Sequence, residues 1–482
     1  MRRAVGAESP SYPLLLVTVS LGGVLAPLNS TMLAVALPEI RRDFSVGHAE
    51  IAWLVSAYLI AMAVAQPIGG RVGDQLGRAR VFRAGLFAFL ILSLAAAFAP
   101  TFPILILLRT GQALIGAAVI PNGMAMLRES VPVYKLGQSG GLTGSAMSLA
   151  AAVGPLLGAG LLAAGSWRWL FLVNAPLVAL ALGSQALLRY PEKPTRKKFD
   201  LDGAGALAFA AVLVSGTFLL NALGGGQSRY GLGAGLALLL ASSAVFLKRQ
   251  LSTATPIAEW SLFRNRSYSA ATAYLLLSNL VMYTTLLAIP FFIKEVQAKG
   301  STTAGTLLGA MSILVAVVSP IAGRLSDAKG RRLPALTGAL IGLGGVTLIL
   351  AGLRQDVAYG YLAASLAILG LGIGLSTGAA STAAIESAPR ELAGIAAGTN
   401  SMMRYLGSIV GVGVLGAILN GDTGAPDVAV FRLIFVVLVV MAALAAASAA
   451  FIHRFLPEPR SPRREPDLAR RDTVRATSAS DL

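Results

Sequence analysis

Fourteen long apolar runs, separated by short clusters of Arg, Lys, Gly and Pro, limit what this chain can fold into. About twenty mostly apolar residues are enough for a helix to cross a bilayer. Backbone in lipid must satisfy its own hydrogen bonds, so each run is predicted to be a helix. The predicted spans are Tyr12–Leu37, Ile51–Gly70, Phe82–Ala99, Phe102–Leu127, Gly137–Ala164, Trp169–Leu188, Leu201–Leu223, Gly231–Leu247, Tyr268–Ile293, Ala304–Leu325, Leu333–Leu353, Ala358–Ile385, Leu392–Leu419 and Val428–Phe455.

The composition agrees with an all-α membrane protein and excludes several other classes. Charged residues make up 13% of the chain, against about 25% in soluble domains. The net charge of +17 does not indicate nucleic-acid binding, because the basic residues lie in loops and in the tail, where membrane topology places them. The chain has no cysteine, which excludes disulfides, thiolate metal sites and a thiol nucleophile.

The distribution of Lys and Arg predicts how the protein is oriented. With a cytoplasmic N-terminus, 29 of the 39 basic residues fall on the cytoplasmic side and 8 on the outer side. The positive-inside rule favours that orientation, and an even number of spans puts both termini in the cytoplasm. The first span is too long for a cleaved signal. We therefore expect a multi-pass protein of the cell (inner) membrane, with a disordered cytoplasmic tail.

One loop occurs twice, which predicts a duplicated unit. GRVGDQLGRAR at 70–80 and GRLSDAKGRR at 323–332 match at a constant offset of 253 residues. Each copy follows the second span of its half, so the chain is predicted to form two pseudo-symmetric six-helix bundles plus two extra central helices. The matching residues are Gly70, Asp74, Gly77 and Arg78 in the first copy, and Gly323, Asp327, Gly330 and Arg331 in the second.

The chemistry of this loop suits a contact that forms and breaks. Glycine permits a tight turn at a helix end. The Asp can accept hydrogen bonds at a neighbouring helix start or pair with the Arg. A contact of this kind can act as a gate between two conformations. The alternative is an ordinary positive-inside turn.

Several segments resemble one known family, the major facilitator superfamily. The repeated loop resembles its motif A, and RTGQALIGAA at 109–118, with Arg109 and Gln112, resembles motif B. LNSTMLAVALPEI at 28–40, WRWLFLVNAP at 167–176 and NSMMRYLGSIVGVGV at 400–414 resemble the 14-helix drug:proton antiporter branch. The residues at motif C spacing are Gly141, Gly154, Pro155 and Gly158.

The resemblance implies export by alternating access, with two departures that bear on proton coupling. Where that branch usually has Asp in its first span, this chain has Asn29, which cannot carry a proton. Asn29 can contact a ligand or bond to a neighbouring helix. No carboxylate lies near the middle of any span. If protons drive transport, the expected carriers are the peripheral acids Glu39 and Asp43.

Two arginines lie deep inside predicted spans. A charged residue there costs about 2.5–3.5 kcal/mol on insertion scales, so Arg109 and Arg404 should face the interior. Arg109 is interpreted as a relay or substrate contact, or else as a structural pair. Two such cations without buried acids disfavour organic cations and allow neutral, anionic or lipid-like substrates. The residues predicted to line a substrate cavity are Asn29, Gln66, Asn122, Asn279, Tyr283, Asn400 and Arg404.

Helix breakers and small residues indicate packing sites. Gly154 and Pro155 predict either a bend that seals the pathway or a passive kink. Gly407 and Gly411 have the GxxxG spacing of close helix packing. The predicted organisation is a cytoplasmic N-terminus (1–11), a first six-helix bundle (12–189), basic linkers with two extra helices (190–267), a second six-helix bundle (268–455) and the tail (456–482).

Together these features favour a multidrug-efflux-type transporter of amphipathic or lipophilic molecules. A lipid or glycolipid flippase on the same fold is the alternative. An enzyme is disfavoured because the two histidines, His48 and His453, are far apart and no triad, phosphate loop or metal set is present. We expect a monomer without cofactor, metal or nucleic acid. Its expected partners are a small amphipathic substrate, protons if transport is coupled to them, and membrane lipid.

Overall fold

The computed structural model consists of helices throughout the part of the chain that it describes. It describes residues 11–131, 133–188, 190, 202–224, 229–253, 259–389, 392–420 and 427–453. Fourteen of its helical segments are long and apolar enough to cross a membrane. The predicted tail and most of the basic linker at 190–201 lie outside the described residues.

The helices agree closely with the predicted spans. In chain order they are α1 (Tyr12–Asp43), α2 (His48–Leu76), α3 (Arg78–Ala97), α4 (Phe102–Ser130), α5 (Val133–Ala163), α6 (Trp169–Leu172), α7 (Asn174–Ala186), α8 (Gly203–Gly224), α9 (Arg229–Ser252), η1 (Trp260–Arg264), α10 (Arg266–Phe291), η2 (Phe292–Val296), α11 (Ser301–Lys329), α12 (Arg332–Gly352), α13 (Tyr359–Glu386), α14 (Ala393–Asn420) and α15 (Val428–Ala450).

Two predicted spans differ in detail from the structure. The sixth span is divided into α6 and α7 at Val173, and the two parts together are long enough to cross the membrane. The ninth span ends in η2, a π-helical turn that follows Pro290 in the last turn of α10. Proline removes a backbone donor and disturbs the regular helical ladder, which explains why the α-helical pattern changes at this position.

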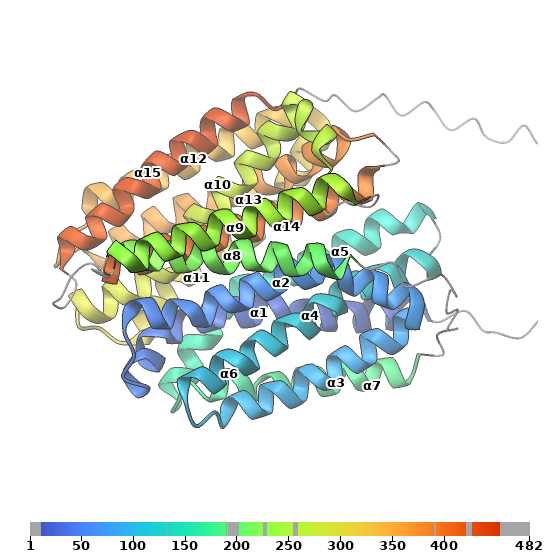
Figure 1. The fold of residues 1–482 in the computed structure, drawn as a ribbon, viewed down its shortest axis with the longest axis horizontal. Helices are drawn as coiled ribbons and strands as arrows, with labels where there is room; N and C mark the ends of the chain where they lie inside the picture. Colours follow the sequence, from blue (N-terminus) through green and yellow to red (C-terminus); the bar gives the residue numbers. More distant parts are fainter. Residues whose placement is uncertain are drawn as a thin grey trace, which may run out of the picture.

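The first six spans (α1–α7) and the last six (α10–α15) pack in the same way. In the first half α1 packs on α5, α2 on α4 and α3 on α4. In the second half α10 packs on α14, α11 on α13 and α12 on α13. In Figure 1 the first half is blue to cyan and the second is yellow to red. The predicted duplication is therefore present in the packing as well as in the sequence.

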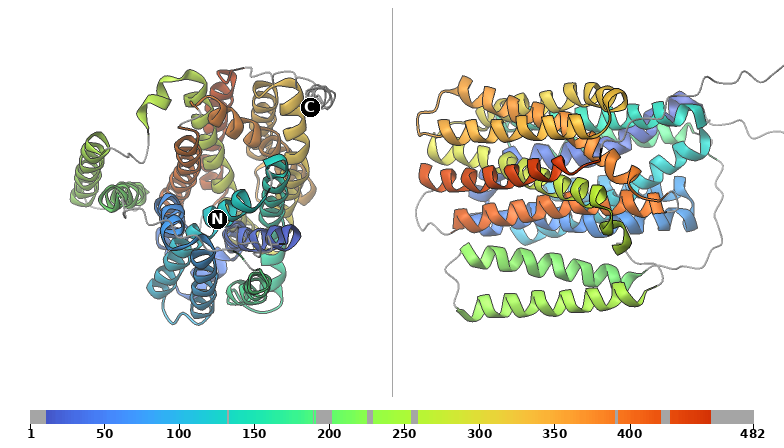
Figure 2. Two further views of the ribbon diagram at one scale, coloured as in Figure 1. Left: turned by 90° about the vertical axis from the view of Figure 1, so that its right-hand side faces the viewer. Right: turned by 90° about the horizontal axis from the view of Figure 1, so that it is seen from above.

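The two halves meet along two equivalent seams. In one seam α5 packs on α11, and in the other α2 packs on α14. The extra helices α8 and α9 form a pair in which α8 lies against both α2 and α14. Figure 2 shows this green pair on one side of the bundle. The extra hairpin therefore covers the α2–α14 seam and leaves the α5–α11 seam without it.

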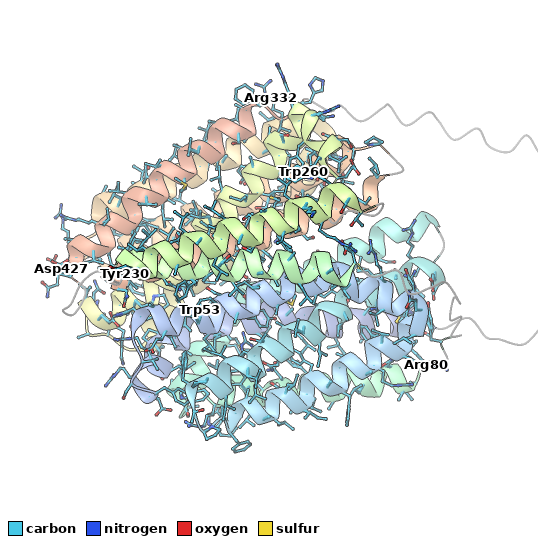
Figure 3. The ribbon with its side chains drawn as sticks, viewed as in Figure 1. Trp53, Arg80, Tyr230, Trp260, Arg332 and Asp427 are labelled. Atoms are coloured by element: carbon cyan, nitrogen blue, oxygen red, sulfur yellow. The ribbon has the colours of Figure 1, made fainter. Side chains whose placement is uncertain are left out.

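Local signals at the helix starts explain where several spans begin. Asn265 caps α10 by accepting hydrogen bonds from the backbone N–H groups of Ser267 and Tyr268, at 2.9 and 3.2 Å. Asp427 caps α15 in the same manner. Figure 3 places Asp427 and Tyr230 at one end of the helices and Arg80 at the other. Such caps satisfy N–H groups that would otherwise have no partner at the ends of the spans.

Candidate functional site

An ionic cluster around Glu295 joins the two halves at one end of the molecule. Glu295 lies on η2 of the second half, and Arg41 and His48 lie at the α1–α2 turn of the first half. Arg41 Nη2 donates to Glu295 Oε1 at 2.5 Å, and His48 Nε2 lies 3.0 Å from Glu295 Oε2. The Glu295 side chain is only 9% exposed. This Glu295 cluster (Arg41, His48 and Glu295) closes the end at which α1 finishes and α2 begins.

A second polar contact between the halves lies near the middle of the molecule. The hydroxyls of Ser30 in α1 and Tyr283 in α10 are 2.8 Å apart. At the other end, where α2 and α11 finish, the ion pairs of the motif A residues Asp74, Arg78, Asp327 and Arg331 stay within each half. The ion pairs described between the halves therefore lie at the Glu295 end.

Arg109 lies in a sealed polar network inside the first half. Its side chain is 1% exposed, and its Nη1 donates to Gln112 Oε1 at 3.3 Å and to Asn29 Oδ1 at 3.4 Å. The guanidinium also lies 4.3 Å from the ring centre of Tyr58. Amide oxygens and an aromatic face therefore stabilise this cation in place of a carboxylate. In this conformation Arg109 is not open to a substrate.

Asn29 belongs to the same network, which favours its helix-bonding interpretation. Its Nδ2 donates to Asn174 Oδ1 at 2.6 Å, and Asn174 Nδ2 in turn donates to Ser93 Oγ at 2.8 Å. All three side chains are at most 2% exposed. The network therefore connects α1, α3, α4 and α7, and Asn29 does not line an open cavity here.

Two other asparagines predicted to line a cavity also bond to neighbouring helices. Asn122 donates to Gly69 O and Asn400 donates to Ser381 Oγ, each at 2.8 Å. Asn279 donates to a carbonyl of its own helix. Gln66 in α2 and Tyr283 in α10 are half-buried, and Arg404 in α14 is exposed. Of the seven positions, these last three are therefore the accessible ones.

The two predicted proton carriers lie at the Glu295 end in different surroundings. Glu39 is half-buried and lines a small pocket together with Lys294 and Pro290. Asp43 is exposed, and its Oδ2 accepts hydrogen bonds from Trp167 Nε1 at 2.9 Å and Arg168 Nη1 at 3.2 Å. Glu39 is thus the more enclosed of the two acids.

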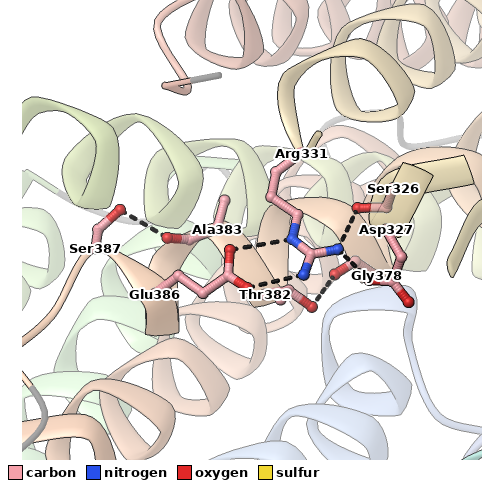
Figure 4. Close-up of polar contacts among 8 residues, drawn as sticks. All are labelled: Ser326, Asp327, Arg331, Gly378, Thr382, Ala383, Glu386 and Ser387. Carbon is pink, nitrogen blue, oxygen red and sulfur yellow. Dashed lines mark hydrogen bonds and ion pairs between the residues drawn. The ribbon is translucent and has the colours of Figure 1, made fainter. Parts of the chain in front are cut away.

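The two copies of motif A form the same three-residue ion cluster. In the second half Arg331 pairs with Asp327 at 2.5 Å and with Glu386 at 2.8 Å, as Figure 4 shows. In the first half Arg78 pairs with Asp74 at 2.7 Å and with Glu129 at 3.0 Å. Each Asp–Arg–Glu cluster ties the loop to the end of the fourth span of its half. The hydrogen bonds to Glu386 raise the pKa of the Arg331 guanidinium above its usual value.

The glycines of this loop have distinct roles. Gly77 and Gly330 have φ values of 97° and 85°, a backbone conformation that favours glycine. They terminate α2 and α11 at equivalent positions. Gly70 and Gly323 lie inside those helices, where a Cβ on Gly70 would make an ordinary contact with Pro121 at 3.6 Å and one on Gly323 would meet nothing within 4 Å. Both loops lie at the same end of the bundle, as the predicted duplication requires.

Motif C lies where three helices approach one another. A Cβ on Gly154 would lie 1.9 Å from Thr31 Oγ1, and one on Gly158 would lie 2.8 Å from Met32 O. The Pro155 carbonyl lies in turn against Gly305 of α11. The helix α5 continues through Pro155 to Ala163. Gly141 lies in α5, in a stretch whose side-chain surroundings are outside the described residues.

The predicted GxxxG packing is confirmed. A Cβ on Gly407 would lie 1.9 Å from Leu276 O, and one on Gly411 would lie 2.8 Å from Leu280 O. These positions bring α14 against α10, which is the counterpart of the α5–α1 contact at motif C. Close helix packing through glycines therefore occurs at equivalent positions in both halves.

Sequence reasoning missed the residues whose partners are distant along the chain. Glu295 was not singled out, although an acid directly after an apolar span and a proline is a visible signal. The sequence pattern alone also does not link Glu129 and Glu386 to the motif A arginines. Within the described segments, no group of three or more His, Asp or Glu side chains is placed to hold a metal ion.

Comparison with known proteins agrees with this architecture. The sequence matches the Major Facilitator Superfamily over residues 19–412. The chain belongs to this superfamily. It is therefore a multi-pass membrane transporter and not an enzyme. The transporter YvkA of Bacillus subtilis, whose function is uncharacterized, is 32% identical over 85% of this chain and 91% of its own length.

Other relatives include proteins named for drug resistance. The multidrug resistance protein Stp of Mycobacterium tuberculosis is 30% identical over 84% of this chain and 75% of its own length. The tetracenomycin C resistance and export protein of Streptomyces glaucescens is 28% identical over 87% of this chain and 78% of its own length. Among solved structures, a D-xylose–proton symporter superposes with a TM-score of 0.67, at 14% identity, over 93% of this chain and 99% of its own. That likeness shows the fold alone.

Proposed function

We propose that this transporter exports amphipathic or lipophilic small molecules by alternating access, as a multidrug-efflux-type secondary transporter. The observation that carries the proposal is the one-sided connection between its halves. The Glu295 cluster holds one end closed, whereas the motif A ion clusters at the other end stay within their own halves. Described ion pairs between the halves at one end, with motif A clusters that stay within their halves at the other, are what one state of an alternating cycle would have.

The proposed direction follows from the proposed orientation. The excess of Lys and Arg favours a cytoplasmic position for the motif A end and for both termini. The Glu295 end then faces outward, and the conformation described here receives substrate from the cytoplasm. The drug-resistance relatives support export through this route.

The proposed gates are the Glu295 cluster on the outer side and the two motif A clusters on the inner side. Asp74, Arg78, Asp327 and Arg331 would change partners when the inner end closes. Gly154, Pro155 and Gly158 would keep α5 close to α1 and α11 during that movement. For a proton-coupled cycle, the proposed carriers are Glu39 and Asp43.

Purified protein in proteoliposomes tests the proposal. A lipophilic fluorescent substrate should accumulate on one side of the membrane, with and without an imposed proton gradient. Glu39→Gln should abolish any response to the gradient, whereas Asp356→Asn, which changes an exposed acid in a loop at the same end, should not. Asn29→Asp should introduce or enhance the response, because it restores an acid to the first span.

The same preparation distinguishes the alternative function. If a fluorescent phospholipid changes leaflet while soluble amphiphiles stay on their own side, the protein is a flippase and not an exporter. If neither moves in either direction, the proposed function is wrong. If transport does not respond to the proton gradient, the proposed roles of Glu39 and Asp43 as proton carriers are wrong, but the proposed export function still stands.

A further inference from the structure

We propose that the centre of the molecule holds a site for the negatively charged group of an amphipathic anion, formed by Arg404 and the hydroxyls of Tyr58, Tyr283 and Tyr405. This inference rests on the proposed export function and names its substrate class. Arg109 is sealed inside the first half and does not itself line the site, but it lies against the ring of Tyr58.

Arg404 is the first element of the argument. It lies inside the membrane span Ile395–Asn420, and its side chain is exposed in this conformation. Its guanidinium makes no hydrogen bond or ion pair with any residue that the structure describes. An arginine in the middle of a span is costly unless a partner or water stabilises it. A planar guanidinium left without a partner is suited to bind a carboxylate, sulfonate or phosphate oxygen.

Three tyrosines on three adjoining helices belong to the site. Tyr405 follows Arg404 on α14, and α14 packs on α10, which carries Tyr283, and on α2, which carries Tyr58. Tyr58 belongs to a hydrophobic cluster against which both Tyr283 and Tyr405 pack. The site therefore draws on both halves, as a site served by alternating access must.

The hydroxyl of Tyr58 is buried without a hydrogen-bond partner, which indicates that a ligand could bond to it. Its side chain is 3% exposed, and the hydroxyl oxygen has no hydrogen-bond partner. A buried hydroxyl without a partner costs free energy that a ligand oxygen would restore. The Tyr58 ring also lies on Arg109, whose positive charge makes the hydroxyl a better donor.

The charges in the central region determine whether an anionic or a cationic ligand is favoured there. Every one of the twelve carboxylates that the structure describes lies at a helix end or in a loop. Arg109 and Arg404 are therefore two cations in the central region without an acid. Coulomb attraction is stronger where little water is present. The centre attracts anions and repels organic cations.

The surroundings of Arg404 also favour an apolar body on the ligand. Met402 and Met403 precede it on α14 and Tyr405 follows it, and Met403 and Tyr405 pack against the same hydrophobic cluster as Tyr283. Methionine and tyrosine present flexible or flat apolar surfaces to a bound molecule. An aromatic or aliphatic molecule with one acidic group therefore fits the site. Such an anion can be a soluble organic acid or an anionic phospholipid.

Two matched fluorescent probes test the inference. They share a naphthalene body with an alkyl chain, and one ends in a carboxylate while the other ends in a trimethylammonium group. Binding to purified protein is measured by fluorescence titration in neutral detergent. The wild type should bind the carboxylate probe more tightly than the ammonium probe. Equal binding, or a preference for the ammonium probe, would overturn the inference.

Variants then locate the site. Arg404→Gln should weaken carboxylate binding about tenfold or more, which is typical for the loss of a charged hydrogen bond. Arg404→Lys should keep part of the affinity, and Tyr58→Phe should weaken it by a smaller factor. Arg354→Gln removes an exposed cation in a loop and should have no effect. Unchanged binding in Arg404→Gln, with thermal stability like that of wild type, would refute the site.

Two further measurements separate the possible outcomes. Competition by phosphatidylglycerol, but not by phosphatidylcholine, would identify an anionic lipid as the occupant, and its absence would identify a soluble anion. If the carboxylate probe binds at Arg404 but is not transported in proteoliposomes, the site is correct and the export function is wrong. If it is transported equally well by Arg404→Gln, the export function is correct and the site is wrong.

Discussion

Arg41 and Glu295, which are 254 residues apart in the chain, form an ion pair of 2.5 Å that joins the first half of the transporter to the second. Neither side chain is fully exposed, at 23% for Arg41 and 9% for Glu295. An ion pair with so little solvent around it is screened less than a surface pair. This pair is therefore placed to hold closed the end at which α1 finishes and α2 begins, the proposed outer end.

Removing the charge of Glu295 should open that end. The chain has no cysteine, so any labelling by a thiol reagent comes from a single introduced cysteine. Thr285→Cys in α10 places the thiol at a fully buried position shortly before η2. In Glu295→Gln, labelling by a membrane-impermeant maleimide should rise several-fold, because Arg41 and His48 lose their ionic partner. Asp356→Asn serves as the control, and equal labelling in both variants would show that the cluster does not hold the end closed.

The buried network predicts opposite effects of the same substitution at two asparagines. Asn29→Asp places a carboxylate beside Arg109, at an oxygen that already lies 3.4 Å from Nη1. The new ion pair compensates a buried cation, so the Tm in detergent should rise. Asn122→Asp puts a carboxylate against the carbonyls of Gly69 and Ala118, so the Tm should fall. Each change should correspond to about 1–3 kcal/mol.

A lower Tm in both asparagine variants would mean that Arg109 gains nothing from a carboxylate. The amides and the Tyr58 ring would then already satisfy it. Arg109→Met provides a second measurement, because it leaves the amide oxygen of Gln112 without this donor and leaves that of Asn29 with Asn174 alone. It should lower the Tm whatever the outcome for Asn29→Asp.

The motif A clusters should affect transport rate far more than stability. Asp74 and Asp327 are 53% and 74% exposed, and exposed ion pairs contribute only about 0–1 kcal/mol to stability. Asp74→Asn and Asp327→Asn should therefore leave the Tm almost unchanged. If the loops close the inner end, each variant should slow transport several-fold in proteoliposomes. Transport at the wild-type rate in both variants would show that the motif A loops have no gating role and are ordinary turns.

The fold was largely predictable because its determinants are local. Apolar length defines each span, and the two copies of the motif A loop define the duplication. The turns at Gly77 and Gly330 followed from the same pattern. The division at Val173 and the π-helical turn after Pro290 were not predicted, because small changes in hydrogen-bond register leave hydropathy unchanged.

The candidate site was predictable only in part, since contacts across helices depend on how the halves dock. Asn29 could be recognised as a polar residue in a span, but its partner Asn174 is 145 residues away. The Glu295 cluster depends on the meeting of η2 with the α1–α2 turn. Burial also decided which predicted cavity residues stay accessible. Arg404 is exposed whereas Arg109 is sealed, although their sequence contexts are alike.

Two glycines in α5 provide the last prediction, because they differ in surroundings but not in chemistry. A Cβ on Gly158 would lie 2.8 Å from Met32 O, whereas a Cβ on Gly160 would meet nothing within 4 Å. Gly158→Ala should force α5 away from α1 and lower both the Tm and the yield of folded protein. Gly160→Ala should raise the Tm slightly, because alanine favours a helix over glycine by about 1 kcal/mol. Thermal unfolding in detergent measures both, and equal shifts would show that the α1–α5 contact does not depend on this glycine.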